Sequence, residues 1–98
     1  MLYMIQYSDN PGTAELRKEH QQDHIGFRRG LGDELKVAGP MFNEDDGPAA
    51  GSMIIVEADS MADAREKVAH DPYLVNGVFK IESVNRINPR TWKSVELG

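Results

Sequence analysis

The chain has 98 residues, enough for one domain with a single modest hydrophobic core, so we treat residues 1–98 as one unit. Its 11 Lys and Arg against 16 Asp and Glu give a net charge of −5, which argues against general nucleic-acid binding because such proteins carry basic surfaces. The absence of cysteine excludes disulfides and thiolate chemistry, and the lack of a secretion signal or a membrane-length apolar run predicts a cytoplasmic domain with no membrane partner.

The first half of the chain predicts a strand, a long helix and a second strand. Residues 2–7 place large apolar side chains on both faces of a strand, so both faces should be covered. After a Pro-Gly break, residues 13–32 predict a helix with Thr13 as its N-cap. Residues 35–42 predict the second strand, in which Pro40 indicates an edge position or a bulge.

The second half repeats this alternation. The apolar run within residues 51–57 is typical of a central strand, and Ser60 begins a second helix with a variant of the capping box. Asp71 followed by a proline starts a further short helical turn. Residues 78–87 predict a fourth strand, and the tail that follows contains Trp92.

The resulting order, β-α-β-β-α-β, indicates an α+β, ferredoxin-like fold: an antiparallel sheet with both helices on one face. This layout leaves the other face of the sheet bare. Because the strands are apolar on both faces, we expect that face to pack against a second copy of the chain, forming a homodimer.

Two side chains far apart in the sequence could form a proton-transfer pair if the fold brings them to one cleft. His24 lies at the edge of an apolar helical arc, where it could face a pocket or bond a backbone carbonyl within the core. Asp71 precedes a proline, which fits a helix N-cap, and a capping carboxylate can also orient an imidazole.

Three more residues stand near this pair. Tyr73 could donate its phenol to a substrate oxygen or simply pack. Arg28 lies one helical turn after His24 and could hold an anionic substrate or remain solvated on the surface. His20 shares the helical stripe, but no third ligand accompanies it, so we predict no metal site.

Several segments occur in a characteristic order: Met1–Ile5, the helix with His24, Ala38-Gly39-Pro40, Gly51-Ser52-Met53, and Asp71-Pro72-Tyr73 followed by Gly77-Val78-Phe79. Over nearly the whole chain, this order and spacing resemble the YciI-like, or YCII-domain, family. The resemblance implies a dimeric α/β barrel, in which two ferredoxin-like subunits pair their sheets, and an active-site His-Asp pair at His24 and Asp71. A relative that resembles this family removes chloride from a chlorinated hydroxyquinol, and muconolactone isomerases share the wider fold.

We therefore predict a small cofactor-free enzyme of the YciI type that acts on a small organic acid or phenol by isomerisation, elimination or hydrolysis. His24 would be the general acid or base and Asp71 its orienting partner, with Tyr73 or Arg28 positioning the substrate. One competing interpretation is a non-catalytic dimeric module that binds a metabolite or assists another enzyme. Another is a haem- or oxygen-handling monooxygenase of the same superfamily. No phosphate-binding loop, serine elbow or dinucleotide motif is present in the sequence.

Overall fold

The structure, a computed structural model, describes residues 1–91, so Trp92 lies outside the described residues. Its strands form one antiparallel sheet in the order β2-β3-β1-β4. The strands are β1 (Leu2–Asp9), β2 (Leu35–Phe42), β3 (Ala49–Glu57) and β4 (Phe79–Ile87). The sheet order is that of two interleaved β-α-β units, as the sequence predicted.

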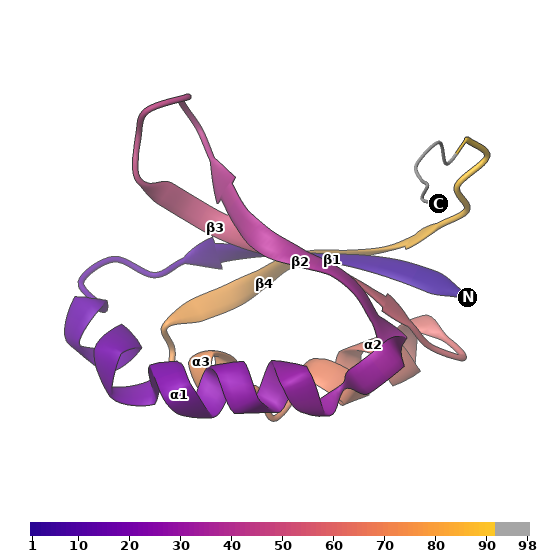
Figure 1. Ribbon diagram of the computed structural model, residues 1–98, viewed down its shortest axis with the longest axis horizontal. Helices are drawn as coiled ribbons and strands as arrows, with labels where there is room; N and C mark the ends of the chain where they lie inside the picture. The colour runs from indigo at the N-terminus through magenta and orange to yellow at the C-terminus, as the bar shows by residue number, and fades with distance from the viewer. Residues whose placement is uncertain (92–98) are drawn as a thin grey trace.

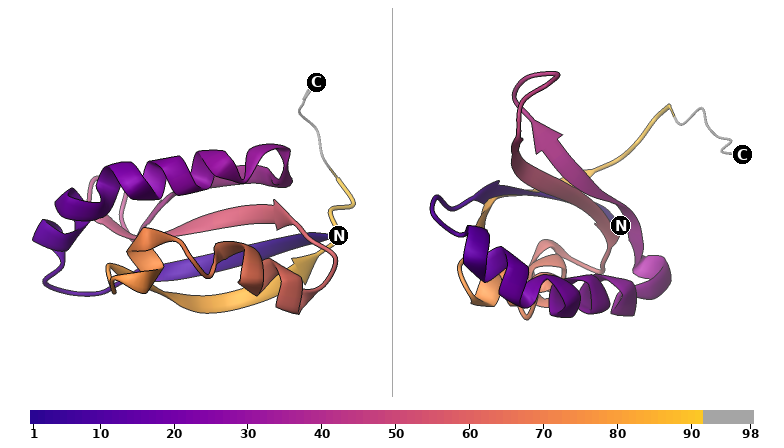
Figure 2. Two further views of the ribbon diagram at one scale, coloured as in Figure 1. Left: turned by 90° about the horizontal axis from the view of Figure 1, so that it is seen from below. Right: turned by 60° about the vertical axis from the view of Figure 1, so that its left-hand side comes forward.

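The helices all lie on one side of the sheet (Figure 1). They are α1 (Ala14–Gly30), the 3-10 turn η1 (Gly32–Glu34), α2 (Met61–Val68) and α3 (Pro72–Val75). Figure 2 shows α1 running along the sheet beside α3 and α2. The predicted α+β architecture with helices on one face is confirmed. Among residues 1–91, no helix combines the length and apolar character that crossing a membrane requires.

The core lies between the helices and the inner face of the sheet. Alternation along β1 buries Tyr3, Ile5 and Tyr7 against the helices, and leaves the intervening side chains half-buried on the outer face. The neighbouring strand β3 supplies Ile54 and Val56 opposite them. The period of two therefore decides which side chains form the core.

Two features of the sheet shape the end of the molecule where the site lies. Pro40 stands in β2, which is the edge strand of the sheet, so the missing N–H costs no interior hydrogen bond and the predicted edge position is confirmed. In β3, a Cβ on Gly51 would lie 2.1 Å from the carbonyl oxygen of Tyr7, so only glycine allows the two strands to approach this closely.

The helices differ in how deeply they pack. Ala64 and Val68 of α2 are buried against the sheet, whereas Met61 of the same helix is exposed. None of the residues of α1 is fully buried, and Leu16 of its apolar arc is exposed. A cavity, described below, lies between part of α1 and strands β2 and β3.

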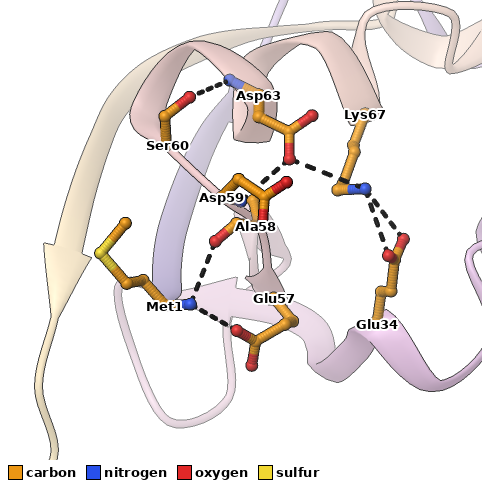
Figure 3. A network of polar contacts seen from close by, with 8 residues as sticks. All are labelled: Met1, Glu34, Glu57, Ala58, Asp59, Ser60, Asp63 and Lys67. Atoms are coloured by element: carbon orange, nitrogen blue, oxygen red, sulfur yellow. Dashed lines mark hydrogen bonds and ion pairs between the residues drawn. The ribbon is translucent and has the colours of Figure 1, made fainter.

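Hydrogen bonds fix the start of α2 as the sequence predicted. Ser60 Oγ accepts a hydrogen bond from the Asp63 N–H at 3.0 Å, and Asp63 accepts one from the Asp59 N–H at 2.9 Å. Lys67, one turn further on, reaches Glu34 of η1, so this network joins α2 to the segment before β2 (Figure 3). Hydrogen bonding to that carboxylate raises the pKa of Lys67.

The start of α1 differs from the prediction. Thr13 occupies the N-cap position, but its side chain makes no capping hydrogen bond. Its hydroxyl instead donates to the Asn10 carbonyl at 2.9 Å. The preceding turn therefore uses the hydroxyl that the sequence assigned to the helix.

Both ends of α3 are closed, which makes this short helix a fixed platform. Asp71 caps its start, accepting a hydrogen bond from the Tyr73 N–H at 2.9 Å. At its end, Gly77 adopts φ 72°, and the Val78 N–H donates to the Tyr73 carbonyl at 2.8 Å. This is the Schellman arrangement, which satisfies carbonyls that would otherwise be left unpaired. The positions of Asp71 and Tyr73 are thereby held from both sides.

Candidate active site

The fold brings together the histidine and the aspartate that the sequence singled out. His24 Nδ1, on α1, lies 2.7 Å from Asp71 Oδ1, at the start of α3, although 47 positions separate the two residues. The Asp71 side chain is 1% exposed and that of His24 is 13% exposed. A carboxylate accepts hydrogen bonds, so Nδ1 carries the proton of this contact, and in the neutral ring Nε2 is then the nitrogen with the free electron pair.

Asp71 makes the contacts that both of its predicted roles require. The oxygen that caps α3 is the same Oδ1 that faces His24. Its second oxygen, Oδ2, lies 3.7 Å from Arg28 Nε. A buried carboxylate needs such partners, because an isolated charge would be costly in this environment. The same carboxylate oxygen therefore caps α3 and contacts His24.

Aromatic rings hold the imidazole in place. The ring of His24 stacks on Tyr73, with centroids 3.9 Å apart and an interplanar angle of 7°, and meets Phe79 edge-on at 6.0 Å. The Tyr73 hydroxyl donates to the Arg17 carbonyl at 3.1 Å, which ties α3 to α1. In the structure Tyr73 thus supports the histidine, and its phenol proton is already engaged.

Arg28 is largely buried beside the pair. Its side chain is 14% exposed, and its guanidinium carbon lies 5.6 Å from the centre of the Tyr7 ring and 5.9 Å from that of Phe79. Burial raises the pKa of Tyr7 to about 12, although the neighbouring Arg28 opposes that rise. Arg28 is therefore not the solvated surface residue that was one of its two interpretations.

A cavity of about 400 Å³ opens beside these residues. Its lining comes from the end of β1, from α1, from the β2–β3 hairpin and from the segment around α3: Asp9, Arg17, His24, Arg28, Ala38, Gly39, Pro40, Ala49, Gly51, Ser52, Tyr73 and Phe79. The volume suits a small organic molecule, and the wall combines aromatic rings with cationic groups. The imidazole of His24 is part of that wall.

Of the four residues predicted for the site, His24, Arg28 and Tyr73 line the cavity, and Asp71 lies directly behind His24. His20 belongs elsewhere, with Nε2 3.7 Å from Glu19. Within residues 1–91, no group of three or more His, Asp or Glu side chains is arranged to hold a metal ion.

Sequence reasoning missed three other contributors. Arg17 precedes His24 by seven positions, two turns of helix, and so lies on the same stripe. Ser52 is a polar residue at an inward position of β3, since it alternates with the buried Ile54. Phe79 begins β4 and looked like ordinary core. The spacing of Arg17 and Ser52 along the chain could have identified them, whereas nothing in the spacing of Phe79 sets it apart from a core residue.

Comparisons with known proteins agree with this architecture. The model of the YCII-related domain matches residues 1–88. Protein YciI of Escherichia coli is 35% identical over 91 residues, covering 86% of this chain and 93% of its own. An uncharacterized protein of Haemophilus influenzae is 31% identical over 86 residues, covering 81% and 88%.

Among solved structures, the chain is similar to 5-chloro-2-hydroxyhydroquinone dehydrochlorinase (TftG) from Burkholderia phenoliruptrix, in complex with 2,5-dihydroxybenzoquinone. The TM-score is 0.78 at 28% sequence identity, and the match covers 90% of this chain and 94% of that one.

Proposed function

This chain belongs to the family of YCII-related domains, and from that premise we propose that it is a small enzyme of the YciI type that moves protons on a small organic acid or phenolic ring. One observation carries the proposal: the 2.7 Å contact between His24 and a buried Asp71 in the wall of a cavity. An imidazole oriented by a carboxylate, next to open space, is an arrangement that serves acid–base catalysis.

The chemistry follows from the tautomer. With its proton on Nδ1, held by Asp71, His24 offers Nε2 as the base. When Nε2 accepts a proton from the substrate, the ring becomes an imidazolium, and the Asp71 carboxylate stabilises that positive charge. Stacking on Tyr73 limits rotation of the ring, so the base stays aimed at one part of the cavity.

Two outcomes use the same first step. In an elimination, Nε2 takes a proton from the substrate, the electron pair of that bond forms a new double bond, and a leaving group such as chloride departs with its bonding pair. In an isomerisation, the imidazolium returns the proton at another atom of the same substrate. Neither outcome changes the overall oxidation state, so acid–base residues suffice. Similarity to a dehydrochlorinase supports the elimination.

We also propose that the outer face of the sheet pairs with that of a second copy, completing a dimeric α/β barrel. The support is an apolar outer surface: Leu2 and Met4 of β1 and Met53 and Ile55 of β3 are only half-buried there. Sedimentation analysis at micromolar concentration tests this, and a monomeric mass would contradict it.

Catalysis is tested directly with a halogenated ring substrate. The protein is incubated with 5-chloro-2-hydroxyhydroquinone, and chloride release is measured for the wild type, His24→Gln and His20→Gln. Losing a general base costs about 10²- to 10⁴-fold in rate, so His24→Gln should fall by that factor. His20→Gln is the matched control, because His20 lies one turn away on α1 and outside the cavity lining.

A folded His24→Gln protein that releases chloride at the full wild-type rate would disprove the assignment. A wild type that binds ring acids in the cavity but converts none of them would favour the non-catalytic binding module instead.

A further inference from the structure

Three polar atoms are buried without a hydrogen-bond partner among residues 1–91: Arg28 Nη2, Ser52 Oγ and the Tyr7 hydroxyl. Buried polar groups are nearly always paired, and each unpaired one costs about 1–3 kcal/mol. Three such atoms from three different elements, α1, β3 and β1, are therefore an anomaly that needs a physical reason.

The three side chains lie in one region of the fold. Ser52 pairs with Tyr7 across β3 and β1, so both side chains project from the inner face of the sheet. The guanidinium of Arg28 lies over the ring of Tyr7. Arg28 and Ser52 both line the same cavity as His24. Two of the three unpaired atoms thus belong to residues of the cavity wall, and the third belongs to Tyr7, a core residue beside them.

The chemistry of these atoms selects the kind of group they would bind. Arg28 can only donate, and it is cationic, while a serine hydroxyl can donate to an anion beside it. The other cation on the cavity wall, Arg17, already pairs with Asp9 at 3.1 Å. Arg28 contacts Asp71 through Nε at 3.7 Å, and its buried Nη2 makes no hydrogen bond among residues 1–91. A negatively charged oxygen is the complementary group.

The other residues of the cavity wall indicate the shape of the molecule that could bind there. Phe79 and Tyr73 present aromatic rings to the cavity, and Gly39 with Pro40 closes it from the edge strand without large side chains. An aromatic wall around a cavity of about 400 Å³ favours a small ring over a bulky or branched chain.

We propose that Arg28 Nη2 and Ser52 Oγ form a subsite for a deprotonated oxygen on a planar ring substrate. This subsite rests on the proposed function, and it narrows the substrate class to ring acids. The ring then lies along the aromatic wall, and its ionised oxygen is held on the Arg28 side while His24 exchanges protons elsewhere on the same molecule. Because Arg28 also faces Asp71, which contacts His24, the residue that binds the anion also lies next to the partner of the histidine.

Ser52→Ala is the cleanest test, because Ser52 Oγ makes no hydrogen bond to residues 1–91 and its loss should leave the fold intact. Binding is measured by titration calorimetry with two probes: 2,5-dihydroxybenzoquinone, which carries acidic ring oxygens, and hydroquinone, a neutral ring of similar size. A hydrogen bond to a charged group predicts about 10- to 100-fold weaker binding of the acidic probe by Ser52→Ala, with hydroquinone changed by less than about twofold.

Ser60→Ala is the matched control, since Ser60 lies at the start of α2, outside the cavity lining and away from the outer face of the sheet. It should bind both probes as the wild type does. His24→Gln separates the two proposals, because it should lose turnover while still binding the acidic probe.

The outcomes are distinct. Equal affinity of the wild type and Ser52→Ala for the acidic probe overturns the subsite and leaves the proposed catalysis standing. An equal loss of both probes would also overturn it, because a merely structural role of Ser52 predicts that result. A wild type that does not bind the acidic probe rejects the ring-acid class itself.

Discussion

Replacing Asp71 by Ala removes three interactions of one buried carboxylate at the same time. The α3 cap is worth about 1 kcal/mol. The charged contact with His24 is worth about 1.5–3 kcal/mol. Arg28 also loses its nearby anion, although at 3.7 Å that pair is long, so we place it at the low end of buried pairs. These contributions overlap, and we expect a total loss of about 3–5 kcal/mol in the free energy of unfolding.

The measurement is equilibrium unfolding in urea at pH 7. Ser60→Ala provides a reference for capping alone, because Ser60 caps α2 through a comparable hydrogen bond of 3.0 Å from the Asp63 N–H. It should cost about 1 kcal/mol. Asp71→Ser keeps a capping oxygen but removes the charge, so it should recover only about 1 kcal/mol of the loss caused by Asp71→Ala.

A loss for Asp71→Ala no larger than that for Ser60→Ala would contradict this expectation. Asp71 would then be a helix cap and nothing more, and its contacts with His24 and Arg28 would have no energetic weight. If Asp71→Ala fails to fold, the comparison between Asp71→Ser and the wild type still measures the charge.

Three further predictions concern other parts of the molecule. Burial raises the pKa of Tyr7 from 10.0 to about 12, so Tyr7 ionises at lower pH in the unfolded chain than in the folded one. The free energy of unfolding should therefore be unaffected by Tyr7 below pH 10 and should fall by about 3 kcal/mol as the pH rises through 12. Tyr7→Phe should remove that part of the alkaline loss in urea titrations, and an identical decline in both proteins would contradict it. Gly51→Ala places a Cβ 2.1 Å from the Tyr7 carbonyl oxygen, so it should severely destabilise the protein, as measured by thermal melting. In Gly26→Ala the new Cβ has nothing within 4 Å, so this variant should stabilise α1 by about 0.5–1 kcal/mol. Lys67→Met breaks the ion pair with Glu34 at the surface and should lower the urea midpoint only slightly. Added salt should reduce this loss further, and a large loss that salt leaves unchanged would contradict the prediction.

The periodic parts of the fold were accessible from the sequence because each depends on neighbours in the chain. Alternation in residues 2–7 decides which side chains of β1 enter the core, and this needs no knowledge of the partner strands. The bounds predicted for β2, residues 35–42, match the structure. Ser60 could be recognised because a capping hydroxyl and the N–H that donates to it lie three residues apart.

Local rules failed where a distant segment competed for the same group. Thr13 has the composition of an N-cap, yet its hydroxyl donates to the preceding turn. The apolar arc beside His24 includes Leu16, yet Leu16 is exposed and no residue of α1 is fully buried. Spacing along a helix cannot reveal that a cavity will occupy the space beside it.

The sequence by itself determined the order of the elements and the inner face of β1, since both follow from periodicities of two and 3.6 residues. It also determined which residue types are available for proton transfer. Only the tertiary structure decided that His24 meets Asp71 and that Ser52 and Arg28 share a cavity wall. Those meetings depend on how α1 and α3 lie across the sheet, which is fixed by packing between segments tens of residues apart and leaves no trace in local spacing.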